Sequence, residues 1–156
     1  MNHAVIRRIL GLILLFESAF LLLPCMVAVI YREKQGLSYL AVAFICLVIG
    51  ILLTRRKNEN QMFYAKEGFV IVALSWIVMS FFGAMPYYLS GDIPDVSQAL
   101  FEAVSGFTTT GASTLSSVEV LSHCTLVWRA FTIWIGGMGV LVFVMMITSL
   151  DDENAM

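Results

Sequence analysis

The chain has 156 residues, of which 60% are hydrophobic and only 13% are charged, and its formal net charge is −2. Soluble globular domains carry about a quarter charged residues, so this composition excludes an ordinary soluble domain. The small net charge gives no electrostatic basis for binding nucleic acid, and the scattered histidines and cysteines suggest neither a zinc site nor a disulfide framework.

Four apolar stretches follow one another along the chain, and each predicts a membrane-spanning helix. About 20 apolar residues in helical conformation cross the hydrocarbon core, where backbone polar groups must find partners within their own segment. The first stretch contains one acid, Glu17, which we assign to packing or assembly, and the last contains one base, Arg129. The predicted spans are Ile9–Ile30, Leu37–Leu53, Phe69–Leu89 and Thr125–Ser149.

Positive charges outside the spans predict the orientation of the chain. Arg7 and Arg8 precede the first span, and the loop Thr54–Gly68 carries four Lys or Arg residues. Only Arg32 and Lys34 lie between the first two spans. Because Lys and Arg are enriched in cytoplasmic loops, we expect a multi-pass protein with both termini in the cytoplasm.

The segment Ser90–Cys124, between the third and fourth spans, has the pattern of a re-entrant pore loop. It contains no Lys or Arg but four acids. The acids would concentrate cations near a pore mouth, or the lack of Lys and Arg simply reflects the positive-inside bias. Asp95 predicts a helix start, and Gly106 predicts the end of a helix too short to span. Irregular backbone at membrane depth needs protein or water around it. The predicted short helix has one apolar face, formed by Val96, Leu100, Phe101 and Val104.

The polar stretch Gly106–Ser113, with the sequence Gly-Phe-Thr-Thr-Thr-Gly-Ala-Ser, suits a cation-selectivity filter. A potassium filter replaces the hydration shell of the ion with backbone carbonyl oxygens, and glycine supplies backbone conformations that other residues avoid. The C-terminus of the preceding helix carries partial negative charge, which favours a cation nearby. Alone, these residues also fit a simple turn between helices, but their place between a short helix and a span favours a filter.

Two sequence blocks resemble the first repeat of the Trk/Ktr/HKT superfamily of potassium transporters, in its bacterial Trk-type pore subunit. They are Ala99–Ser113, and Trp128–Phe131 followed by Trp134–Gly139. The resemblance covers the whole chain and implies an all-α membrane protein with four transmembrane helices, one re-entrant pore helix and a filter loop. It implies an N-terminal helix pair at 1–60, the first span–pore helix–filter–span repeat at 61–150, and the start of a truncated cytoplasmic linker at 151–156.

The same resemblance implies which residues meet the ion. Thr109, Thr110 and Gly111 would line the path of K⁺, mainly through backbone carbonyls, with Ala112 at the outer edge. Gly111 matches the filter glycine that the superfamily associates with preference for potassium over sodium. K⁺ is then the transported ion, and no organic cofactor is implied.

Glu102 and Arg129 are candidates for bracing the pore loop. A charge inside the membrane is costly and calls for a partner, and Arg129 lies near the outer end of the fourth span. The alternative for Arg129 is that its side chain extends outward to the membrane interface.

The superfamily's pore subunit has four such repeats in one chain, whereas this chain has one. We therefore expect an N-terminal fragment of a potassium uptake pore in the plasma (inner) membrane, contributing one of four filter strands. The implied partners are the other three repeats or copies of this chain, a homodimer of the intact subunit, a cytoplasmic nucleotide-binding regulatory subunit, and lipid.

Two alternatives remain open, a cation channel built from four copies of this chain and a fragment that does not transport. An enzyme is disfavoured. Ser105, Ser113 and His123 could suggest a hydrolase, but no nucleophile-elbow motif and no acid or histidine at a suitable spacing supports one.

Overall fold

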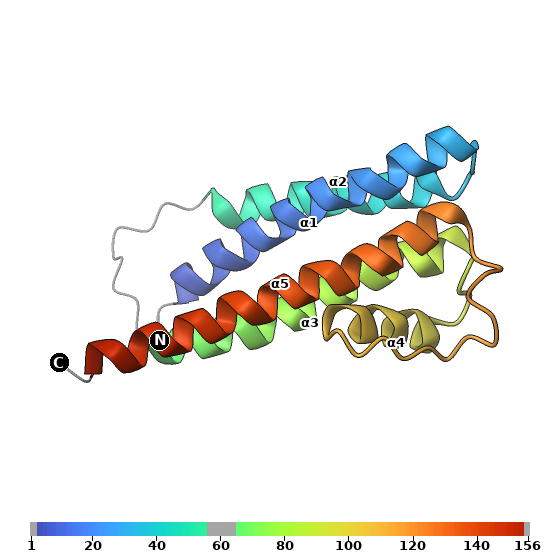
Figure 1. Ribbon diagram of the computed structural model, residues 1–156. Coiled ribbons are helices and arrows are strands. Elements are labelled where there is room, and N and C mark those ends of the chain that lie inside the picture. Colours follow the sequence, from blue (N-terminus) through green and yellow to red (C-terminus); the bar gives the residue numbers. More distant parts are fainter. Residues whose placement is uncertain (1–2, 56–64, 155–156) are drawn as a thin grey trace.

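The computed structural model describes residues 3–55 and 65–154, which form five helices and no strand (Figure 1). The four long helices each contain a segment long and apolar enough to cross a membrane, which confirms the predicted all-α membrane fold. The helices are α1 (His3–Tyr31), α2 (Gly36–Thr54), α3 (Ala65–Ser90), the short α4 (Val96–Phe107) and α5 (His123–Asn154).

The long helices form two antiparallel pairs (Figure 1). Helices α1 and α2 pack closely against each other, whereas α3 and α5 touch at few positions and pack mainly on α1 and on the short α4. The short helix α4 packs against α3 and α5 and occupies only one half of their length (Figure 1). The turn between α1 and α2 lies toward the same end as α4, which we call the pore-helix end. The first turn of α1 and the last turn of α5 lie at the opposite end, as an even number of spans requires.

Several helices extend beyond the apolar stretches that predict them. Helix α3 begins at Ala65 rather than Phe69, and α5 continues to Asn154, so the expected linker start is helical over residues 151–154. An apolar run marks the part of a helix in hydrocarbon, whereas intrahelical hydrogen bonds continue into its polar flanks. The rest of the expected linker and the expected boundary at residue 60 lie outside the described residues.

Helix α4 begins as the sequence predicts, but it ends differently. Asp95 has an extended backbone, and its Oδ1 accepts a hydrogen bond of 2.8 Å from the amide of Ser97, which caps the helix. Gly106 does not end the helix, which runs on through Phe107. Gly106 instead allows a close approach to α5, because a Cβ there would lie only 2.3 Å from Thr132 Oγ1.

The apolar face of α4 points away from the rest of the described chain. Small residues and one acid make its buried face, including Ala99, Glu102 and Ala103. The four predicted apolar residues are all exposed, from 40% for Leu100 to 61% for Val96. In a membrane protein this face meets either lipid or further protein.

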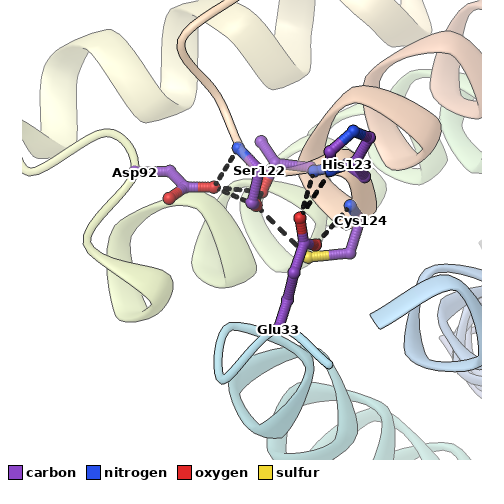
Figure 2. Close-up of polar contacts among 6 residues, drawn as sticks. Glu33, Asp92, Ser122, His123 and Cys124 are labelled. Atoms are coloured by element: carbon purple, nitrogen blue, oxygen red, sulfur yellow. Dashed lines mark hydrogen bonds and ion pairs between the residues drawn. The ribbon is translucent and has the colours of Figure 1, made fainter. Parts of the chain in front are cut away.

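A polar cluster at the pore-helix end ties the two helix pairs together (Figure 2). The carboxylate of Glu33, in the turn after α1, accepts hydrogen bonds from the amides of His123 (2.8 Å) and Cys124 (3.0 Å). These amides open α5, where a helix has unpaired donors and partial positive charge. The His123 ring also lies 2.8 Å from Glu33 through Nδ1 and stacks on Tyr31. Burial alone would raise the pKa of Glu33, but the donors of Cys124 and His123 outweigh burial and lower it to about 2.

Asp92 makes the second half of this cluster (Figure 2). Its Oδ2 accepts hydrogen bonds from the amide and hydroxyl of Ser122 and, at 2.6 Å, from the hydroxyl of Thr125. Thr125 in turn lies 2.8 Å from the hydroxyl of Tyr39 in α2. The start of α5 is therefore held by α2, by the turn after α1 and by the segment after α3.

Candidate ion-filter site

The filter segment starts with a sharp change of backbone direction at the end of α4. The amide of Thr109 donates to the carbonyl of Gly106 and the amide of Thr110 donates to that of Ser105, which is the pattern of a Schellman cap. The left-handed residue of this cap is Thr109, with φ of +57°, a conformation rare for a β-branched side chain. Gly111 is also left-handed, with φ of +70°. Backbone strain of this kind is concentrated at functional sites.

Hydrogen bonding divides the carbonyls of this segment into two groups. The carbonyl of Thr108 accepts from the hydroxyl of Thr109 (2.7 Å), and that of Ala112 accepts from the hydroxyl of Ser105 (2.6 Å). The carbonyls of Thr109, Thr110 and Gly111 accept no hydrogen bond from any described part of the chain. These three residues are also exposed. Three consecutive carbonyls are therefore available to a ligand.

Glu102 fixes the return of the loop after these carbonyls. Its Oε1 accepts hydrogen bonds from the hydroxyl of Ser113 (2.6 Å) and the amide of Thr114 (2.9 Å). Its Oε2 accepts from Nε of Arg129 in α5, at 2.8 Å. The structure thus brings Glu102 and Arg129 together, in a pair whose side chains are 0% and 17% exposed.

Phe107, two residues before the three unoccupied carbonyls, is anchored from both sides. Its carbonyl accepts a hydrogen bond of 3.0 Å from Nε1 of Trp76 in α3. On the α5 side, a Cβ on Gly136 would lie 2.1 Å from the same carbonyl oxygen, so only glycine fits there. The ring of Phe107 packs against Gly83, whose carbonyl accepts from Nε1 of Trp128 at 3.0 Å.

Several of these residues were not identified from the sequence. For Gly136, a signal exists in the sequence, because glycines close together in an apolar helix allow a neighbouring helix to approach closely. Trp76 and the pair Glu33 and His123 carried no such signal, because no spacing rule connects residues that are 31 or 90 positions apart.

The chemistry available at the filter segment is that of neutral oxygen ligands. No group of three or more His, Cys, Asp or Glu residues that could hold a metal occurs in the described residues. Consecutive carbonyls on an exposed strand can replace part of the hydration shell of a cation, and a complete shell needs oxygens from other strands.

Comparison with known proteins places the chain in a family. The family model for TrkH, described as a cation transport protein, matches residues 37–156. The chain belongs to the TrkH family. It is 39% identical, over its whole length, to the Trk system potassium uptake protein TrkH of Salmonella typhimurium, and it covers 33% of that protein. It is also 39% identical, over 88% of its length, to an uncharacterised cation transporter of Methanocaldococcus jannaschii, of which it covers 29%.

Solved structures give the same family. The crystal structure of the potassium transporter TrkH from Vibrio parahaemolyticus matches 94% of this chain with a TM-score of 0.88 and 33% sequence identity, and this chain covers 32% of it. The chain therefore spans about a third of the length of the TrkH proteins that it matches. The resemblance predicted from the sequence to a Trk-type subunit is confirmed.

Proposed function

We propose that this chain is the N-terminal part of a potassium uptake pore and supplies one of its four filter strands. The observation that carries the proposal is the run of three exposed carbonyls at Thr109, Thr110 and Gly111, which no described hydrogen bond occupies. Neutral carbonyl oxygens in sequence are the ligands with which a filter replaces the water around K⁺. Membership of a cation transport family supports the same role.

The surroundings of the strand support a rigid filter. Glu102 holds the loop on its far side through Ser113 and Thr114, while Trp76 holds its near side through Phe107. The hydroxyl of Ser105 already occupies the carbonyl of Ala112, which makes this carbonyl less available to an ion than the three before it. We therefore place the main K⁺ ligands of this strand at three carbonyls and give Ala112 a lesser role.

The proposal includes partners that complete the pore. One strand provides part of an ion shell, and the exposed apolar face of α4 offers a surface for neighbouring repeats. That the chain spans a third of its relatives supports further repeats as the source of the other strands. A homodimer of the intact subunit and a cytoplasmic nucleotide-binding regulator follow from the family resemblance, as does an inner-membrane location with both termini in the cytoplasm.

The test is complementation of potassium-dependent growth in a bacterium that lacks potassium uptake. A chimera in which this chain replaces the matching third of the Salmonella typhimurium relative should restore growth on low potassium. The chain alone should not. Growth with the chain alone, together with a stable tetramer in mild detergent, would instead establish a channel of four copies.

The filter itself is tested by a glycine pair within the chimera. Gly111→Ser should reduce the preference of uptake for potassium over sodium, because Gly111 lies in the filter with φ of +70°. Gly91→Ser is the matched control, since Gly91 has φ of +80° and, as at Gly111, a Cβ there would have no atom within 4 Å. Equal selectivity changes in both variants would contradict the assignment of the filter.

A further inference from the structure

Two glutamates of this chain are equally buried but have opposite surroundings. Glu17 in α1 and Glu102 in α4 are each 1% exposed. Glu102 accepts three hydrogen bonds, one of them from the cation of Arg129. Both carboxyl oxygens of Glu17 are buried and have no hydrogen-bond partner among the described residues. None of the ion pairs formed within residues 3–55 and 65–154 involves Glu17.

Glu17 lies where the N-terminal helix pair meets the first repeat. Its neighbours along the same face of α1, Leu14 and Leu21, are buried and apolar. From α3, a Cβ on Gly83 would lie 3.4 Å from Oε1 of Glu17, an ordinary contact distance, so α3 packs directly beside the carboxyl. The titratable group that interacts with it from α2 is the thiol of Cys46, which is fully buried. The site is closed by helices of this chain alone.

An ionised carboxylate cannot be accommodated in these surroundings. Removing a charged carboxylate from water is so unfavourable that, inside proteins and membranes, the group is either paired with a donor or cation, or neutral. Glu102 is paired, with Arg129 and two other donors. The surroundings of Glu17 offer no described donor or cation, so its carboxyl must be neutral.

We propose that Glu17 is a proton-binding site within the membrane, and that its carboxyl is held as the neutral acid while α1, α2 and α3 are packed together. The ligand is one proton, taken up on the carboxylate oxygen when the helix pair docks on the repeat. The site is separate from the filter carbonyls, and the proposal does not depend on K⁺ passing through them.

Infrared spectroscopy of the purified chain in mild detergent at neutral pH tests the site directly. The wild type should show the C=O stretching band of a protonated carboxylic acid. The band should be lost in Glu17→Gln, which preserves the shape of the side chain, and kept in Glu102→Gln, which removes the paired carboxyl. A wild type without the band, or a band that persists in Glu17→Gln, would overturn the proposal.

Two further measurements use the wild type alone, so their results do not depend on whether a variant folds. Labelling the wild type with ¹³C-glutamate should shift the band, and an unshifted band would assign it to an aspartate and refute the site. Exchanging choline for sodium or potassium at constant ionic strength should leave the band unchanged. Loss of the band in either alkali cation would show that a metal cation, rather than a proton, occupies Glu17.

Discussion

Replacing Arg129 with methionine tests the brace of the filter loop. Methionine keeps much of the length and apolar volume of the side chain but leaves Glu102, whose side chain is 0% exposed, without its cation. Removing one partner of a buried ion pair costs about 3–5 kcal/mol, because the remaining charge stays buried. The two other donors to Glu102 reach only Oε1, so Oε2 loses its single described partner. We expect a loss of about 3 kcal/mol in unfolding free energy, at the lower end of that range.

The assay is unfolding in mixed detergent micelles, followed by circular dichroism and tryptophan fluorescence, on a double-mutant cycle. In the double variant Glu102→Gln and Arg129→Met, the amide oxygen of Gln can still accept from Ser113 and Thr114, and no buried charge remains. The double variant should therefore lose only about 1 kcal/mol, the usual value of one hydrogen bond. A single variant that loses less than about 1 kcal/mol, or strictly additive effects, would refute the brace.

Three further perturbations probe the contacts around the proposed filter and the polar cluster at Glu33. Gly136→Ala should lower the unfolding free energy by about 1–3 kcal/mol, because its methyl would overlap the carbonyl of Phe107 at 2.1 Å. Gly137→Ala is the control, since its nearest contact is 3.9 Å, and an equal loss in both would contradict the close approach. Ser105→Ala should lower the unfolding free energy by about 1 kcal/mol, because it removes the hydrogen bond to the carbonyl of Ala112, and an unchanged value would show that the bond is not formed. Glu33 has a pKa lowered from 4.5 to about 2, so its stabilisation is complete above pH 4.5 and is lost as pH falls through 2. As pH falls from 4.5 to 2, the unfolding free energy of the wild type should therefore decline more steeply than that of Glu33→Gln. An equal decline in both proteins would contradict this.

The spans and the pore helix could be predicted from local patterns. Hydrocarbon forces backbone groups to pair within each segment, so long apolar runs with at most one charge predict α1, α2, α3 and α5 without any tertiary information. Asp95 likewise predicted the start of α4, because its cap acts over two residues. The end of α4 was predicted wrongly at Gly106. That glycine serves contact with Thr132 in another helix, and chain order does not reveal such a contact.

The candidate site, too, could be predicted from the sequence only in part. The sequence identified Thr109, Thr110 and Gly111 as candidates because the filter pattern is local, and it suggested Glu102 and Arg129 because charges in an apolar segment need partners. The sequence could not show which carbonyls are occupied by hydrogen bonds. The carbonyl of Ala112, for example, is occupied because the hydroxyl of Ser105 in α4 points toward it.

What the sequence determined by itself was the class of protein and the number of spans, and it also located the proposed filter segment. All three rest on neighbouring residues along the chain. Only the tertiary structure decided that the apolar face of α4 is exposed, that Trp76 and Gly136 hold Phe107, and that Glu17 is enclosed by this chain rather than available for assembly. These facts depend on how separate helices pack, and the rotation of one helix against another is set by contacts between distant residues.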